Sequence, residues 1–350
     1  MLFRSPAVSV VMAAYNGAAL LPETLTSLCA QTFTDWELVV VDDRSTDDTV
    51  AVLRAWPDPR IRVIEASENG GPVRARNLAV SHARGRYLAA LDHDDLCRPE
   101  RFARQVAYLD AHPDVVVVGT AADNLIDGVL SHPDHPPITT PALTEWLLMI
   151  GNPLVWSSTM LRGDAVRRLD PFTRPELLYA EDFDLYHRLA PLGRIARLDE
   201  VLVAYRIHPG GVSKRFASRM VDGSVAVLEA AHRPLFGDDA GRVAMLFSRH
   251  LMLRESVPDR ATLAELGAAL GRAQAHHLDS REHDADDRRL IRWETARRWA
   301  RVGRAGLRTG ALSVGDLVAT RPDHLGLGYA GPGDLLWSRA IGRARTLGAA

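Results

Sequence analysis

Short apolar runs alternate with helix-forming segments over roughly the first 120 residues, and this alternation restricts the fold more than any other feature. Uninterrupted apolar runs of this length are typical of buried parallel strands. Strands separated by helices of about 10–15 residues form right-handed βαβ units and a mostly parallel sheet. We therefore expect an α/β fold, with strands at Ala7–Ala13, Glu37–Val41, Ile61–Glu65, Arg86–Leu91 and Val115–Gly119 and helices at Ala19–Ala30, Thr49–Trp56 and Pro72–Ala83.

Acidic residues directly follow two of these strands. Asp42 and Asp43 end the second strand, and Asp92-His93-Asp94-Asp95 follows the fourth. Like charges crowded at the end of a buried strand repel one another, so folding alone gives no reason for them. Strands of such a sheet deliver these residues to one edge, where α/β proteins bind ligands. Clustered carboxylates bind Mg²⁺ or Mn²⁺ and leave positions for diphosphate oxygens, so Asp92-His93-Asp94 predicts a divalent metal site.

Composition argues against several classes of protein. The net charge of −2 gives no general attraction for nucleic acid. The turn after the first strand lacks the GxGxxG sequence of a Rossmann dinucleotide fold, and no GxxxxGK[ST] sequence occurs in the chain. Cys29 and Cys97 lack the spacing of a zinc site or a disulfide framework and indicate reduced thiols. No apolar stretch reaches the roughly 18–20 residues that span a bilayer, and no signal-peptide layout opens the chain. We expect a cytoplasmic protein, at most peripheral at the inner face of the membrane.

Further candidate residues lie where other strands end and helices begin. Tyr15-Asn16-Gly17 ends the first strand, where an aromatic ring and an amide could bind a nucleobase; the alternative is that Tyr15 packs on the next helix. Asn69-Gly70-Gly71 precedes a helix, so its backbone N–H groups could hold an anion, with Arg76 adding charge. Each pattern alone is weakly specific.

Two groups between residues 176 and 208 could also take part in chemistry. Glu181 and Asp182 lie on a segment expected to be helical over Glu176–Leu189, and Asp182 is a candidate general base if it faces the crevice. A solvated helix face is the alternative. His208 follows an expected hairpin of Ile195–Leu198 and Val201–Arg206. It could bind a metal or a phosphate, or lie on the surface.

Five segments, taken in order, resemble the family 2 glycosyltransferases, which have the GT-A fold and act with inversion. The segments are VSVVMAAYNG, ELVVVDDRSTDDT, ENGGPVRARNLAVSHARGRYLAALDHDD, AEDFDLYHRL and YRIHPGGVS. The resemblance covers about residues 6–215, and the combination is highly specific. It implies transfer from a nucleotide sugar, by default a UDP-sugar, with Mn²⁺ or Mg²⁺ as cofactor. The acceptor would be a glycan, lipid-linked or small molecule, in glycan, cell-envelope or natural-product biosynthesis.

The resemblance also implies a role for each matching residue. Asp182 resembles the catalytic base, Asp94 the metal ligand, and His208 the histidine near the diphosphate and metal. Eight positions are expected to bind substrate. Tyr15 and Asp42 would contact the nucleobase with Ala13 and Asp43 beside them, Arg76 would face the donor, and Asp92 would contact the ribose or sugar. Glu181 lies next to the catalytic base, and Trp156 lies in the acceptor region. Asp95 would support the metal ligands.

The chain departs from the family pattern at two positions and has one segment without a match. Ala13 stands where the family usually has proline, and His93 occupies the middle of the DxD sequence instead of a small residue. Trp156 lies in the segment Asn152–Arg162, expected to be a strand, at the place where the family recognises acceptors. That segment resembles no particular acceptor class.

Two other functions are the alternatives. A nucleotidyltransferase would have a basic, Gly-rich loop directly after the first strand, but Tyr15-Asn16-Gly17 contains no Lys or Arg. A non-catalytic sugar-nucleotide or polysaccharide-binding module would bind the donor without turnover. The presence of Asp94, Asp182 and His208 argues against the second alternative.

The chain is expected to have a catalytic domain at 1–212 and a helical region at 213–350. The nucleotide-sugar half of the catalytic domain would be about 1–120, and the acceptor half about 121–212. In the helical region, eight arginines and one acid, Glu294, lie between Arg288 and Arg308. This segment could be a basic amphipathic helix on an anionic membrane. A helix packed on the catalytic domain, its arginines paired with acids, is favoured because the apolar face is rich in alanine.

Overall fold

The computed structural model describes residues 5–211, 215–320, 322 and 335–341, and the chain divides into two compact units. Unit 1 comprises residues 1–141 and 153–223, and unit 2 comprises residues 142–152 and 224–350. The last two residues of the YRIHPGGVS segment, and residues 323–334 and 342–350 of the expected helical region, lie outside the described residues.

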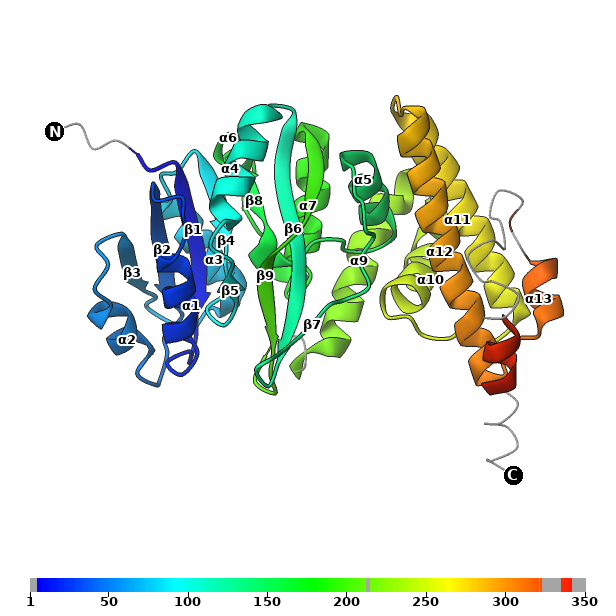
Figure 1. The fold of residues 1–350 in the computed structure, drawn as a ribbon, viewed down its shortest axis with the longest axis horizontal. Coiled ribbons are helices and arrows are strands. Elements are labelled where there is room, and N and C mark those ends of the chain that lie inside the picture. Colours follow the sequence, from blue (N-terminus) through cyan, green and yellow to red (C-terminus); the bar gives the residue numbers. More distant parts are fainter. Residues whose placement is uncertain (1–4, 212–214, 321, 323–334, 342–350) are drawn as a thin grey trace. The chain divides into compact units, whose positions relative to one another are not determined.

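The described part of unit 1 is built on a nine-stranded sheet of order β3-β2-β1-β4-β8-β6-β9-β5, with β7 paired to β6 (Figure 1). β1 to β4 form a parallel half, and β6 and β9 are also parallel, whereas β8, β7 and β5 pair antiparallel. The expected α/β fold is confirmed. The strands are β1 (Val8–Ala14), β2 (Trp36–Asp42), β3 (Ile61–Glu65), β4 (Tyr87–Ala90), β5 (Leu96–Cys97), β6 (Val115–Ile126), β7 (Val129–Ser131), β8 (Met160–Arg162) and β9 (Arg194–Ile207).

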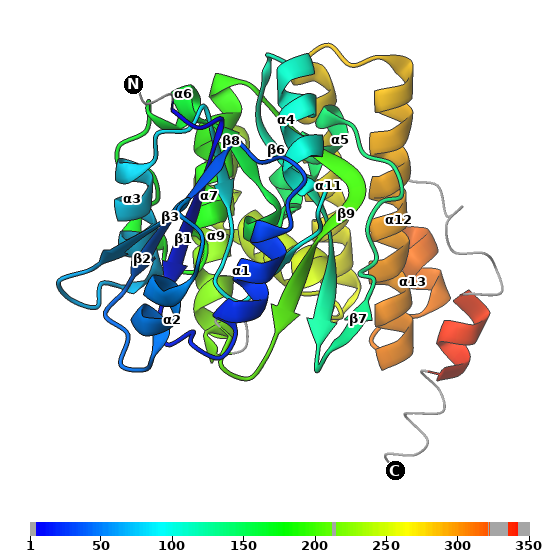
Figure 2. The same ribbon diagram turned by 60° about the vertical axis from the view of Figure 1, so that its left-hand side comes forward.

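Helices cover both faces of the parallel half (Figure 2). On one face, Val10 and Met12 of β1 share a core with Leu25 of α1 and Phe102 of α4. On the other face, α3 packs across β1 and β2. Because both faces are covered, β1 and β2 are buried along their whole lengths and read as continuous apolar runs. These helices are α1 (Leu21–Cys29), α2 (Thr49–Ala55), α3 (Gly71–His82) and α4 (Arg101–Ala111).

Three expected elements differ from the structure. The hairpin over 195–206 is wrong, because both halves pair in parallel with β6 as one strand, β9, in which Asp199 and Glu200 are extra residues. The helix expected from Glu176 begins later, as α7 (Glu181–Leu189), after a 3₁₀ turn at Pro175–Leu177. The expected strand over Asn152–Arg162 is reduced to a 3₁₀ turn, η1 (Trp156–Ser158), and the short β8.

In the residues of unit 2 that the structure describes, the regular secondary structure is entirely helical. Unit 2 receives one helix, α5 (Pro141–Ile150), from the middle of the unit 1 sequence. The Trp146 ring of α5 lies 5.7 Å from the His277 ring, and the Met149 carbonyl accepts a hydrogen bond from His232 Nε2 at 2.7 Å. The other helices are most of α9 (Ala217–Phe236), α10 (Ala240–Leu246), a π-helical segment at Phe247–Met252, α11 (Arg260–Ser280), α12 (Ala285–Thr309) and α13 (Val314–Ala319).

The arginine-rich segment forms most of α12. Ile291, Trp299 and Leu307 are buried, whereas Leu290 and Trp293 are partly exposed. Glu294 is fully buried and pairs with Arg297 and Arg298 at 2.7 and 2.8 Å. These contacts fit a helix packed by its apolar face, and peripheral membrane contact stays a prediction. Within the described ranges, no helix combines the length and the apolar character needed to cross a bilayer.

Candidate functional site

Asp42 lies at the carboxyl end of β2, beside the end of β1. Its Oδ2 accepts a hydrogen bond from the backbone N of Ser45 at 3.0 Å. Its Oδ1 is buried and has no hydrogen-bond partner among the described residues. Tyr15 follows β1 directly and is 45% exposed. This strand end therefore offers a ligand an aromatic ring and a carboxylate oxygen that can accept a hydrogen bond.

Hydrogen bonds join the loop after β1 to the loop after β2. Asn16 Oδ1 accepts a hydrogen bond from Thr46 N at 2.8 Å, and Ser45 Oγ accepts one from Asn16 N at 2.9 Å. Asn16 has a φ of 49°, a left-handed conformation that asparagine tolerates. The side-chain oxygen of Asn16 is therefore used within the protein to hold this loop, and Tyr15 is the exposed aromatic side chain beside it.

Asp43, one residue after Asp42, has a different position. Its two carboxylate oxygens accept hydrogen bonds from the backbone N atoms of Gly70 and Gly71, both at 2.8 Å. A carboxylate is favourable there because it pairs N–H groups that a helix start leaves unbonded. The N–H groups expected to hold a ligand anion are thus occupied by a carboxylate of this chain. Asp43 fixes the start of α3, the helix that carries Arg76.

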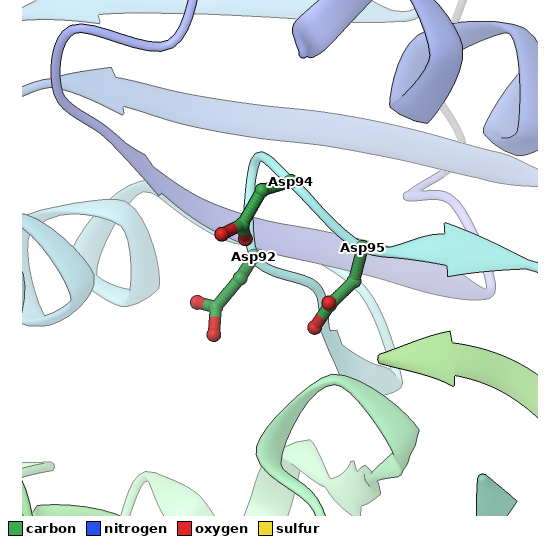
Figure 3. A group of neighbouring side chains, drawn as sticks. All are labelled: Asp92, Asp94 and Asp95. Carbon is green, nitrogen blue, oxygen red and sulfur yellow. The ribbon is translucent and has the colours of Figure 1, made fainter. Parts of the chain in front are cut away.

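Three carboxylates lie together on the turn after β4 (Figure 3). Asp92, Asp94 and Asp95 can each place a ligand oxygen within 4.8 Å of the others. Asp95 is fully buried; its Oδ1 accepts from Arg206 N at 2.8 Å, whereas Oδ2 has no partner in the described part of the chain. Burial and then the carboxylates of Asp94 and Asp92 raise the pKa of Asp95 well above its ordinary value. An orphaned oxygen in a set of clustered carboxylates fits Mg²⁺ or Mn²⁺.

The end of β9 brings two further side chains to this turn. His208 Nε2 lies 3.0 Å from Asp94 Oδ2, so the structure joins the two predicted metal ligands across 114 residues of sequence. Arg206 Nε donates to the backbone O of Asp94 at 2.8 Å, and its Nη2 donates to Glu23 Oε2 at 2.6 Å. Arg206 was not predicted as a site residue. Its place two residues before His208 in YRIH is the signal that could have identified it.

Arg76 links the acidic turn to the first turn of α7. Its Nη2 donates to Asp92 Oδ1 at 2.8 Å, its Nη1 donates to Glu181 Oε1, and its Cζ lies 4.8 Å from the centre of the Trp156 ring. Burial lowers the pKa of Arg76, but the charges of Asp92 and Glu181 outweigh it and raise that pKa overall. Arg76 Nε and Glu181 Oε2 are buried without a partner among the described residues.

Trp156 lies beneath Arg76 and is only 6% exposed. Its ring packs against Phe172 at a centroid distance of 6.2 Å. It therefore supports the guanidinium group, and a direct contact with an acceptor stays a prediction.

Asp182 differs from its neighbours on α7 in being partly exposed, with Oδ1 accepting from Phe183 N at 2.7 Å. Its charge contributes to raising the pKa of Arg76, the residue that also bonds Asp92. Asp184 is buried and bonded to Arg174 and Arg188 instead.

The two departures from the family pattern touch each other. His93 Nδ1 lies 3.3 Å from the backbone O of Ala13, and the backbone O of His93 accepts from Thr24 Oγ1 at 3.0 Å. The His93 ring also lies against Gly17: a Cβ atom there would be 2.3 Å from His93 Cδ2. The residue inside the acidic sequence thus packs against the loop that follows β1.

Sequence comparison finds relatives of this chain among glycosyltransferases. The family described as glycosyl transferase family 2 matches residues 9–167. The putative glycosyltransferase EpsE of Bacillus subtilis is 31% identical over 234 residues, which cover 65% of this chain and 83% of that protein. The Escherichia coli protein WfaP, a UDP-Glc:alpha-D-GlcNAc-diphosphoundecaprenol beta-1,3-glucosyltransferase, is 29% identical over 210 residues, 59% of this chain and 79% of that protein. The uncharacterized protein y4gI of Sinorhizobium fredii is 44% identical over 131 residues, 36% of this chain but only 14% of that protein.

Two solved structures share the fold. TarS 1–349 of S. aureus, in complex with UDP-GlcNAc, has a TM-score of 0.53 and 18% identity and covers 97% of this chain and 92% of that one. The mannosyltransferase PcManGT of Pyrobaculum calidifontis, in complex with GDP-Man and Mn²⁺, has a TM-score of 0.55 and 19% identity and covers 97% and 88%. At these identities the likeness shows the fold alone, and it confirms the expected GT-A fold with a helical C-terminal region.

Proposed function

This chain belongs to glycosyltransferase family 2, and from that premise we propose that it transfers a sugar from a UDP-sugar to an acceptor hydroxyl or amine in the biosynthesis of cell-envelope polysaccharide. The proposal depends mainly on the cluster of carboxylates Asp92, Asp94 and Asp95. His208 contacts this cluster at Asp94, and Arg76 links it, through Asp92, to Glu181. UDP is favoured as the nucleotide because WfaP is named for UDP-Glc and TarS holds UDP-GlcNAc.

The donor would lie along the edge formed by the ends of β1, β2 and β4. Asp42 Oδ1 accepts a hydrogen bond from the uracil N–H, and the Tyr15 ring covers the base. A divalent cation at Asp94 and His208, with Asp92 and Asp95 beside it, would stabilise the negative charge of the leaving diphosphate. Arg206 and Arg76 hold these carboxylates in position through the contacts described above.

The transfer itself is a single displacement at the anomeric carbon. The acceptor oxygen or nitrogen forms its bond from the face opposite the diphosphate, the C–O bond to the diphosphate breaks, and its electron pair leaves with the phosphate. Asp182 takes the proton of the acceptor as this happens. Glu181 is less suited to that task because Arg76 is bonded to it, whereas Asp182 is the more exposed carboxylate. The configuration of the sugar carbon is inverted.

Donor turnover in the presence and absence of metal tests the proposal. We expect UDP-Glc or UDP-GlcNAc to be turned over with Mn²⁺ or Mg²⁺, and Asp94→Asn to lower kcat by at least about 100-fold. Asp182→Asn should leave UDP affinity nearly unchanged while transfer falls steeply. Asp127→Asn, which alters a carboxylate in the β6–β7 turn, is the control and should behave as wild type. Full activity in excess EDTA, or a wild-type rate in Asp182→Asn, would contradict the mechanism, and binding without turnover would indicate a non-catalytic module.

A further inference from the structure

An aromatic pair with one member close in sequence to the candidate base has no part in the mechanism above. Tyr179, three residues before Asp182, has a φ of 72°, which is uncommon for a bulky side chain and marks a backbone held in place by its surroundings. Its ring stacks on Phe216 at the start of α9, with centroids 4.5 Å apart and planes inclined by 16°. The strained backbone and the stacked rings fix this surface next to the first turn of α7.

The first turns of α9 pack directly on the segment that precedes the candidate base. A Cβ atom at Gly223 would lie 2.8 Å from the Cβ of Ala180, the residue before Glu181, so only glycine permits this approach. Burial raises the pKa of the Tyr179 phenol, while the charges of Arg219 and Arg215 lower it and that of Glu181 raises it. Both arginines and Glu181 are therefore within electrostatic reach of one ring.

The two arginines are held on this aromatic pair without carboxylate partners. The Cζ atoms of Arg215 and Arg219 lie 5.3 and 5.9 Å from the centre of the Phe216 ring. Both side chains are exposed, and neither forms an ion pair with any residue that the structure describes. Several other exposed arginines of unit 1 do pair with acids, for example Arg86 with Asp110 at 2.6 Å. Two guanidinium groups gathered on one aromatic ring and without ion pairs among the described residues are suited to an anionic substrate group.

We propose that Arg215 and Arg219, positioned by the Tyr179–Phe216 pair, form a subsite for a phosphate group of the acceptor, so that the acceptor is a sugar linked to a phosphate or diphosphate. The proposal rests on the proposed function, because the acceptor nucleophile must reach Asp182. The donor diphosphate belongs at the acidic turn, where a cation balances its charge. A phosphate on the acceptor needs its own cationic partners on the Asp182 side, and guanidinium groups bind phosphate oxygens in pairs.

Binding of geranyl diphosphate, measured by calorimetry with saturating UDP and Mn²⁺, tests the subsite. We expect wild type to bind geranyl diphosphate and to bind geraniol much more weakly. The double variant Arg215→Ala/Arg219→Ala should bind the diphosphate about 100-fold more weakly, roughly tenfold for each arginine. Its affinity for UDP should not change. Arg104→Ala, which removes an exposed arginine paired with Glu200 at 3.4 Å, is the matched control and should bind both ligands as wild type does.

The remaining outcomes separate this proposal from the proposed function. Unchanged diphosphate affinity in the double variant, or wild type that binds UDP but no geranyl diphosphate, would overturn the subsite and leave the transferase proposal standing. A loss of UDP affinity in the double variant would assign the arginines to the donor diphosphate and also overturn it. If wild type binds no UDP, the proposed function fails, and the diphosphate titration without UDP still decides whether the arginines bind phosphate. Because both side chains are exposed, circular dichroism should show the double variant folded.

Discussion

Gly17 and His93 should behave as one steric unit, and substituting Gly17 by alanine tests this. The new Cβ atom would lie 2.3 Å from His93 Cδ2, 3.0 Å from Nε2 and 3.3 Å from Cγ. The φ of Gly17 is not in the left-handed region, so alanine is excluded there by the ring and not by the backbone. Relieving the contact requires the ring, whose Nδ1 now lies 3.3 Å from the Ala13 carbonyl oxygen, to move by roughly 1 Å.

Two consequences follow for Gly17→Ala. Overpacking of this kind lowers the free energy of unfolding by about 1–3 kcal/mol. Because His93 stands between Asp92 and Asp94, a displacement of about 1 Å should also misplace the carboxylates and lower kcat by up to about 100-fold. In a His93→Ala background the same substitution meets no ring, so it should cost little. The coupling free energy between the two substitutions should therefore be about 1–3 kcal/mol.

A double-mutant cycle measures this coupling by urea unfolding and by donor turnover. Gly315→Ala is the control, since a Cβ there would meet no atom closer than 3.6 Å. We expect Gly17→Ala alone to be impaired and the pair Gly17→Ala/His93→Ala to match His93→Ala. If Gly17→Ala equals wild type in both measurements, or if the two substitutions are additive, the steric coupling is refuted.

Three further substitutions test the two aspartates at the end of β2 and a buried histidine of unit 2. Asp43→Asn should lower the free energy of unfolding by about 1–3 kcal/mol, and with it the melting temperature, because its amide turns a donor toward Gly70 N or Gly71 N. Asp42→Asn should instead weaken UDP binding at little cost in stability. The reverse result in thermal melts and UDP titrations would exchange the roles of the two residues. Burial lowers the pKa of His232 in the folded chain below the ordinary value of about 6.5. As pH falls below about 6.5, this histidine is protonated in the unfolded chain before it is protonated in the folded chain, so the free energy of unfolding decreases. His232→Gln, which keeps a donor for the Met149 carbonyl, should remove that loss, worth up to about 1.4 kcal/mol per pH unit; equal pH slopes in urea unfolding of wild type and variant would exclude it.

The sequence pattern was sufficient to place Asp42, Asp92 and Asp94 at one edge of a sheet, because each follows a continuous apolar strand and parallel strands share their carboxyl edge. The sequence pattern could not show that Asp42 is available to a ligand whereas Asp43 is bonded within the protein. Neighbouring residues at a strand end point to opposite sides, and only the position of α3 shows that Asp43 bonds the helix start.

Contacts between distant segments had no local signal. Arg76 with Glu181 and Asp94 with His208 are separated by 105 and 114 residues, and only the family resemblance suggested that these residues belong to one site. The hairpin expected over 195–206 was wrong for a related reason. Two polar residues between apolar runs are typical of a turn, and whether Asp199 and Glu200 form a turn or a bulge depends on the pairing with β6.

The two ends of β2 show how the fold distinguishes its structural carboxylates from those available to ligands. Near the amino end, Glu37 is buried and both its oxygens are bonded, to Ser9, Arg62 and Arg84. Those hydrogen bonds outweigh burial and lower its pKa. At the carboxyl end, Asp42 Oδ1 is buried without a partner in the described part of the chain, and the same holds for Asp95 Oδ2 and Glu181 Oε2.

A buried acceptor without a hydrogen-bond partner costs about 1–3 kcal/mol. In the proposed function Asp42 binds the nucleobase, Asp95 lies beside the cation, and Glu181 precedes the catalytic base on α7. A buried carboxylate can have both oxygens hydrogen-bonded within the protein, as Glu37 on the same strand shows. Among the carboxylates of unit 1 that the structure describes, this cost falls on those at the proposed site, where a nucleotide N–H and a cation could remove part of it. Ligand binding should therefore stabilise unit 1 more than the contacts with the ligand alone would suggest.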